Sequence, residues 1–165
     1  MIPELISCLD RTTAYIRALV ADLTDEEMIL QPPGVPNHAA WTLGHVIHSW
    51  RVMAGEMGVG SWLPDDWESL FGYGSSPANV GGSRHSSKAA LIASLVDASD
   101  RLRRVLLAAE EKTLRAPLPD VESREVFSTT GEALVQIVCA HTAFHAGQLA
   151  AWRRAIGRQP TGVFI

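Results

Sequence analysis

Residues 129–157, TTGEALVQIVCAHTAFHAGQLAAWRRAIG, contain the helical pattern that decides the fold. Apolar residues recur there at the spacing of one helix face, and Thr129 or Thr130 is a suitable N-cap before them. Gly157 indicates that the helix ends just before it. Counted from Leu134, the inward positions are Leu134, Ile137, Val138, His141, Phe144, His145, Gln148, Leu149, Trp152 and Ile156. We therefore predict a long helix whose buried face carries two histidines and a glutamine.

Three more long helices are predicted upstream of this one, and no convincing strand pattern is visible. They cover residues 3–23, 38–57 and 87–109, each with an apolar stripe at helical spacing. Asn37 is the expected N-cap of the second. Residues 24–27 read as a capping box that opens a short extra turn. The helix over residues 38–57 has two apolar faces, so we expect it to be covered on both, by its own bundle or partly by a second subunit.

The connection over residues 58–86 indicates how these helices are arranged. It is rich in Gly, Ser and Pro, with one short helix expected around residues 65–71. A helix of 20 residues is about 30 Å long, so a chain that returns along it to start a parallel neighbour needs a long crossover. We therefore predict one all-α domain over residues 1–165, a four-helix bundle in the order up, down, down, up.

Composition excludes several classes of function. The chain has 165 residues, 47% hydrophobic and 19% charged, and a net charge of −4, which argues against nucleic acid as the main partner. No secretory signal is visible, and no run reaches the ~18–20 apolar residues that span a bilayer. Cys8 and Cys139 are expected as small buried side chains rather than a disulfide. We predict a cytoplasmic protein that acts on a small molecule and has no membrane partner.

A metal site is one interpretation of the histidines in the last helix. His141 and His145 are four residues apart, so their Cβ atoms lie roughly 5–6 Å apart on one face and can chelate one ion. A hydrogen-bonded core pair or a surface pair would show the same spacing. A third ligand from another helix would favour the metal, and His45 is the candidate. It lies ~12 Å into its helix and His145 ~16 Å from the end of its own, depths that match to about one turn in antiparallel helices.

Other residues leave two interpretations open. His48, three residues after His45, is a rival ligand but is better explained as a hydrogen-bonded core or rim side chain. His38 and His85 are expected to be exposed to solvent. Gln148 could hydrogen-bond a ligand or pack the helix seam. Four aromatic residues of the long connection could plug the end of the bundle, line a pocket, or do both: Trp62, Trp67, Phe71 and Tyr73.

The combination of two motifs resembles a known family. Trp41-Thr-Leu-Gly-His45 in the second helix, with His141-x-x-x-His145-x-Gly-Gln148-Leu in the fourth, is similar to the DinB superfamily of bacterial four-helix proteins, also called DinB/YfiT-like putative metalloenzymes. The resemblance covers nearly the whole chain, including the helix order and the long second connection. It implies that His45, His141 and His145 bind a divalent metal, commonly zinc or nickel.

Three histidines have a definite chemical consequence. They leave a divalent ion with at least one open position, as in catalytic rather than structural zinc sites. Imidazole suits zinc, nickel, copper or iron, so the ligands alone do not select the metal. Thr142 stands where the H-E-x-x-H metalloproteases have their glutamate, so that reading lacks its general base. No separate catalytic acid or base is identified, which leaves the metal ligands as the catalytic group.

Three functions are compatible with such a site. The resemblance implies thiol-dependent S-transfer, or an isomerisation of the maleylpyruvate type, with a low-molecular-weight thiol such as bacillithiol or mycothiol. The second is metal-assisted hydrolysis. A thiol with sugar and carboxylate groups would need cationic anchors, and only Arg51 and Arg153 are close in sequence to the histidines. The third is a stress-related binding protein in which the ion staples the bundle, with His48 or a carboxylate as fourth ligand.

A homodimer is also expected. The second helix is apolar on two faces and its Trp50 edge is expected to be exposed, which favours burial against another copy of the chain. Two-fold dimers are the commonest assembly of soluble proteins.

Overall fold

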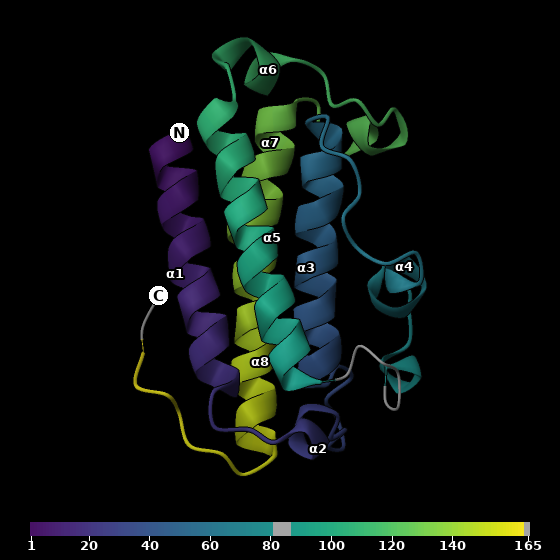
Figure 1. Ribbon diagram of the computed structural model, residues 1–165, viewed down its shortest axis with the longest axis vertical. Coiled ribbons are helices and arrows are strands. Elements are labelled where there is room, and N and C mark those ends of the chain that lie inside the picture. Colours follow the sequence, from purple (N-terminus) through teal and green to yellow (C-terminus); the bar gives the residue numbers. More distant parts are fainter. Residues whose placement is uncertain (81–86, 164–165) are drawn as a thin grey trace.

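The protein is all-α over the described residues 1–80 and 87–163 of the computed structural model, which confirms the predicted fold class. Its elements are α1 (Ile2–Val20), α2 (Asp25–Met28), α3 (Ala39–Glu56), α4 (Trp67–Phe71), η1 (Pro77–Asn79), α5 (Lys88–Ala108), α6 (Glu111–Arg115), η2 (Glu122–Glu125), α7 (Thr130–Leu134), η3 (Val135–His141) and α8 (Thr142–Ala155). The last three form one continuous helical rod, so the long helices pack as a bundle (Figure 1).

The long helices run in the order of directions expected from the long connection. In Figure 1, α1 and the rod α7–η3–α8 run down the page, whereas α3 and α5 run up. Helix α5 packs against both α1 and α3, and α8 does the same from the other side. The Lys88 N–H donates to Asp25 Oδ1 at 2.7 Å, which ties the start of α5 to α2. The chain therefore returns along α3 before α5 begins.

The N-caps of α2 and α7 were predicted correctly. Thr24 and Thr129 each form a complete capping box, with Glu27 and Glu132 at the third helical position. The predicted cap of α3, Asn37, is wrong. His38 is the cap, and its Nδ1 accepts the Trp41 N–H at 3.1 Å. This role also corrects the expectation that His38 is exposed.

The hydrophobic core lies between the long helices and contains large side chains from all of them. Leu9, Leu102 and Trp152 are fully buried. Trp50 is also fully buried, so the expected exposed edge of α3 is wrong. Its indole Nε1–H donates to Thr142 Oγ1 at 3.0 Å, which satisfies the polar end of the ring inside the core. The exposed Trp50 edge therefore no longer supports a homodimer, which stays a prediction.

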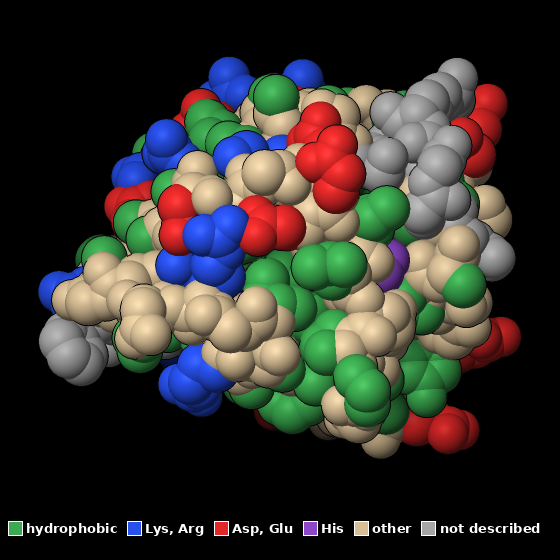
Figure 2. Space-filling model, turned by 90° about the horizontal axis from the view of Figure 1, so that it is seen from below, with side chains coloured by type: hydrophobic (Ala, Val, Ile, Leu, Met, Phe, Trp, Pro, Cys, Tyr) green, Lys and Arg blue, Asp and Glu red, His purple; other side chains and the backbone are tan. Residues whose placement is uncertain are grey.

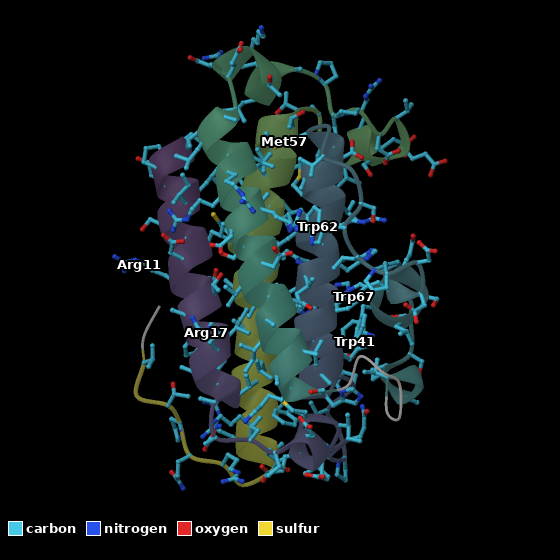
Figure 3. The ribbon with its side chains drawn as sticks, viewed as in Figure 1. Arg11, Arg17, Trp41, Met57, Trp62 and Trp67 are labelled. Atoms are coloured by element: carbon cyan, nitrogen blue, oxygen red, sulfur yellow. The ribbon has the colours of Figure 1, made fainter. Side chains whose placement is uncertain are left out.

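The second apolar face of α3 is covered by α4 along its first part, within the same chain, whereas Val52 farther along is 40% exposed. Trp67 and Phe71 of α4 are buried against α3, and the Trp67 indole N–H donates to the Gly44 carbonyl at 3.1 Å. Figure 3 shows Trp41 and Trp67 on this side of the bundle. These aromatics therefore seal the flank of α3 rather than the end of the bundle. Tyr73, which follows, is fully exposed.

The segment η3 is π-helical, with one residue more per turn than the α-helices on either side. Thr142 Oγ1 donates to the carbonyl of Ile137, five residues earlier, at 2.8 Å. The wide turn moves the inward face by about one residue. Thr142 and Ala146 are therefore buried, whereas Phe144, predicted to face inward, is 63% exposed.

Charges of both signs are mixed at the α2 end of the molecule. Figure 2 shows Lys and Arg side chains next to Asp and Glu side chains on this face. The buried Arg153 donates to Asp22 through two nitrogens, at 2.5 and 2.8 Å, and joins α8 to the end of α1. None of the described helices is long and apolar enough to cross a membrane.

The two cysteines are free thiols, as expected. Both are partly buried, and the Cys8 thiol lies against the carbonyl of Val138 in η3, at 3.8 Å. Burial and the neighbouring Cys8 raise the pKa of the Cys139 thiol to about 11, so it stays protonated at neutral pH. His85, expected in the Gly/Ser loop, lies outside the described residues.

Candidate metal centre

Three predicted residues come together on the flank between α3 and the last helical rod. His45 of α3 approaches His141 of η3, with 3.3 Å between their Nε2 atoms. His141 approaches His145 of α8, with 3.1 Å between theirs. One nitrogen from each ring lies within 4.8 Å of the other two, the arrangement needed to hold one metal ion. His48 lies outside this group among the described residues.

Two of the three rings are held by acceptors on their far side. His45 Nδ1 lies 2.7 Å from the carbonyl oxygen of Phe71, which can only accept, so this nitrogen carries the proton. His145 Nδ1 lies 2.9 Å from Gln148 Oε1 and donates in the same way. The Nε2 lone pairs of both rings are therefore directed at the centre of the group. This is the usual arrangement behind metal-binding histidines.

His141 differs from the other two ligand candidates. Its Nδ1 is buried and has no hydrogen-bond partner among the described residues. Burial is the largest of the effects that lower the pKa of His141 to about 3 and the pKa of His145 to about 4. Burial lowers the pKa of His45 as well. The three imidazoles are therefore neutral at pH 7, the form that binds metals.

Three positions of the motif around His45 have a structural explanation. Trp41 stacks on the His45 ring at 4.7 Å between centroids, with 9° between the planes. Gly44 has no side chain because Phe71 occupies that space, and an added Cβ would lie 2.1 Å from its ring. Phe71 therefore packs on Gly44 and offers its carbonyl to the next residue, His45. This close approach positions one histidine from α4, which the sequence pattern did not connect with it.

Other sequence expectations for this site are resolved by the contacts. Gln148 fulfils the first of its two expected roles, because it hydrogen-bonds the candidate metal ligand His145 and orients its ring. Thr142 is fully buried and bonded to Trp50 and Ile137, so it is a structural residue where a metalloprotease has its base. The role of the Phe71 carbonyl was missed because a backbone carbonyl leaves no sequence signal. The stacking of Trp41 on His45 was also missed, although its spacing of four residues could have indicated it. Gln148, three residues after His145, was found from helical spacing, although His145 was not named as its partner.

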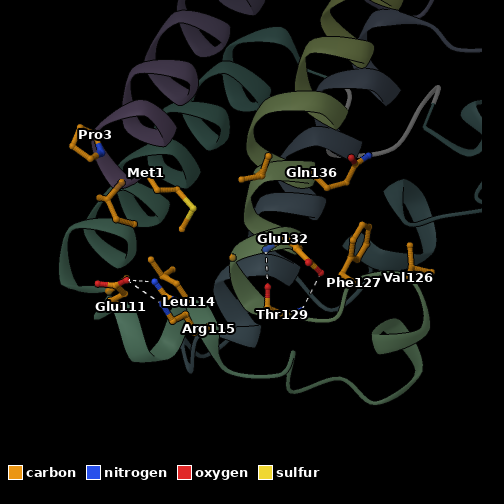
Figure 4. A pocket seen from close by; sticks show the side chains of 14 residues that line it. Met1, Pro3, Glu111, Leu114, Arg115, Val126, Phe127, Thr129, Glu132 and Gln136 are labelled. Atoms are coloured by element: carbon orange, nitrogen blue, oxygen red, sulfur yellow. Dashed lines mark hydrogen bonds and ion pairs between the residues drawn. The ribbon is translucent and has the colours of Figure 1, made fainter.

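A cavity of about 280 Å³ opens beside the histidines. His45 and His141 form part of its lining, and its walls between α3 and the segment before α7 are mainly apolar. A larger hollow of about 1,210 Å³ lies at the N-terminal end of α1 (Figure 4). It contains none of the three histidines, and its Glu111 and Arg115 pair with each other at 2.6 Å. The smaller cavity is therefore the candidate substrate site.

Comparison with known proteins agrees with the site geometry. The family model described as "DinB superfamily" matches residues 9–149, which include all three histidines. The chain belongs to the DinB superfamily. The crystal structure of a conserved protein from Enterococcus faecalis has a similar fold, with a TM-score of 0.79 and 18% sequence identity, over 96% of this chain and 98% of that chain. No curated protein shows significant similarity to this DinB-superfamily chain.

Proposed function

We propose that this DinB-superfamily protein is a metal-dependent enzyme in which His45, His141 and His145 bind one divalent ion, with zinc or nickel as first candidates. The convergence of three Nε2 atoms at 3.1 and 3.3 Å carries the proposal. Lone pairs this close repel each other unless a proton or cation lies among them. Three neutral imidazoles, two of them oriented by an acceptor on their far side, are a donor set that suits a divalent ion.

The surrounding residues support a catalytic rather than a structural role. Neither His48 nor a carboxylate joins the group among the described residues, so the closed four-ligand site of a structural ion is not formed there. His45 and His141 face the cavity, which gives a small molecule access to the open side. A bound ion would lower the pKa of a thiol or a water molecule that reaches it, and so supply a nucleophile at neutral pH.

We favour thiol-dependent transfer or isomerisation, in which the sulfur of a low-molecular-weight thiol attacks an electrophilic carbon. Trp41 shields one face of His45, and the mainly apolar walls limit the access of water to the reacting groups. Hydrolysis is the second candidate. One observation favours hydrolysis. A thiol that carries carboxylates would require Lys or Arg side chains around it, and neither residue type lines the described part of the cavity.

The two reactions are separated by assaying the zinc- and nickel-loaded protein with the electrophile 1-chloro-2,4-dinitrobenzene, with and without cysteine or cysteamine, and with p-nitrophenyl acetate in the absence of thiol. Metal-dependent conjugation that disappears in His141→Ala supports the transferase. Ester hydrolysis with the same dependence, and no conjugation, supports the hydrolase. Rates equal to those of His141→Ala in every assay would contradict both.

A further inference from the structure

The cavity beside the histidines has two chemically different ends. Its histidine end lies near the middle of α3, whereas Glu56 is the last residue of that helix. The eleven residues between His45 and Glu56 span about 16 Å at the helical rise per residue. A volume of about 280 Å³ spread over that length describes a narrow cavity, at the small end of the range for ligand sites.

The far end of the cavity is acidic. Glu56 and Asp120 both line it, and they are held together because the Asp120 N–H donates to Glu56 Oε2 at 2.7 Å. Asp120 Oδ2 in turn accepts from the Ser123 N–H at 3.0 Å. These bonds fix the positions of both carboxylates without removing their charge. The partial negative charge of the C-terminus of α3 adds to them.

A single cation offsets that charge only in part. The pKa of the Asp120 carboxyl is lowered by hydrogen bonds from Ser123 and also by the charge of Arg124, whose guanidinium donates to the carbonyls of Leu118 and Pro119. One cation therefore stands beside two carboxylates. At the N-terminus of α7, the Glu132 N–H donates to Thr129 Oγ1 and the Thr130 N–H to the Ala116 carbonyl, and the Glu132 carboxylate offsets the positive end of that helix. No Lys or Arg lines the described part of the cavity.

The walls between the two ends are apolar and partly aromatic. Val52 and Met53 of α3 face Ile137 and Phe127, and the exposed Tyr73 stands at the rim. Aromatic faces attract cations as well as apolar groups. An occupant that satisfies all of these surfaces is elongated and apolar, with a positive charge at one end.

We propose that the substrate of this site is a small, elongated, largely apolar molecule with a cationic amine at the end bound by Glu56 and Asp120. Its other end reaches the histidines. This inference rests on the proposed function only for the reactive character of that end. The same charge pattern disfavours a thiol cofactor that carries carboxylates and favours a neutral or amino thiol.

The proposal is tested by calorimetry with three probes that share one chain: hexyltrimethylammonium, hexan-1-ol and hexane-1-sulfonate. The quaternary ammonium group cannot bind a metal, so it reports only on the cavity. At low ionic strength we expect the cation to bind about tenfold more tightly than the alcohol, and the sulfonate most weakly. Sulfonate or alcohol binding as tight as that of the cation would overturn the proposal.

Two variants locate the preference. The double variant Glu56→Gln, Asp120→Asn keeps hydrogen-bond acceptors at both positions and removes both charges. We expect it to bind hexan-1-ol unchanged, which reports an intact cavity, and to lose the preference for the cation. Glu68→Gln, on α4 and outside the lining of this cavity, is the matched control and should keep that preference. A preference that survives the double variant, or that Glu68→Gln removes equally, would contradict this assignment.

The measurements are made on metal-free and on zinc-loaded protein. A chain that takes up no metal but still prefers the cation would refute the proposed function and leave the cavity assignment intact. A chain that binds zinc but shows no preference for the cation would refute the cavity assignment and leave the proposed function intact.

Discussion

At the scale of single residues, Gly44 shows how a backbone position controls the histidine site. Its missing side chain lets the Phe71 ring pack on α3, and this contact brings the Phe71 carbonyl to His45 Nδ1. His45 could be predicted from helical spacing and from the motif. Its acceptor could not, because the carbonyl belongs to a connection of the chain whose path spacing does not determine.

Gly44→Ala is expected to destabilise the protein by about 1–3 kcal/mol, because the new Cβ overlaps the buried Phe71 ring. Displacing Phe71 also removes the acceptor of His45, so zinc affinity should fall. Chemical denaturation and zinc calorimetry measure the two effects. Gly55→Ala, on the same helix with open space around its Cβ, is the control and should be neutral or stabilising by up to ~1 kcal/mol. Equal effects of the two substitutions would contradict this explanation.

Gln148→Leu tests the second oriented ring. It leaves His145 Nδ1 without its acceptor, so we expect zinc affinity to fall about 10–100-fold, as is typical when a partner behind a metal ligand is lost. Calorimetry with zinc measures this. Gln136→Leu, an exposed residue of η3, should bind zinc like the wild type. An unchanged affinity in Gln148→Leu would show that the glutamine only packs the seam.

At the scale of elements, helical spacing predicted the existence of each long helix but not the phase of the last one. The sequence of η3 carries no Pro or Gly that marks a wide turn, so a regular count placed Phe144 inside. The π-helical turn instead buries Thr142, whose hydroxyl bonds both the Ile137 carbonyl and the Trp50 indole. Wide turns of this kind often occur at functional sites, and this one carries His141.

Thr142→Val is therefore expected to cost about 1–3 kcal/mol, because the Trp50 N–H is left buried without a partner. Urea denaturation measures the loss. Thr12→Val is a matched control, because this buried threonine of α1 bonds only carbonyls of its own helix. It should cost much less, and equal losses would show that the hydroxyl of Thr142 has no special role.

At the scale of the whole molecule, the all-α class, the helix order and the three histidines were predictable, because long amphipathic stripes and motif spacing are encoded locally. The cover of α3 by α4 was not. A helix with two apolar faces can be buried by its own chain or by a second copy of the chain, and its local sequence does not distinguish these two cases. The burial of Trp50 follows from that packing.

Burial of the neutral histidines predicts how stability depends on pH. The folded pKa values of about 3 for His141 and about 4 for His145 lie below their ordinary 6.5, so the unfolded chain binds more protons between these values. The free energy of unfolding of metal-free protein should therefore fall as the pH decreases from about 6.5 toward 3. Hydrogen bonds from Arg153 lower the pKa of Asp22 from 3.8 to about 2, which adds a further loss between these values.

Urea denaturation between pH 7.5 and 4.5 measures this dependence. His141→Ala should show a shallower decline than the wild type, because one group that titrates on unfolding is gone. Stability that is constant or rises as the pH falls over this range would contradict neutral buried histidines.

The central claim is that His45, His141 and His145 form a metal site. Its most direct test is metal content per chain by mass spectrometry, on protein purified without an affinity tag and dialysed against zinc or nickel. We expect about one ion per chain in the wild type and in His48→Ala, which removes a cavity histidine outside the group, and none in His141→Ala. A folded wild-type protein that retains neither metal, or a His141→Ala variant that retains as much as the wild type, would contradict the account.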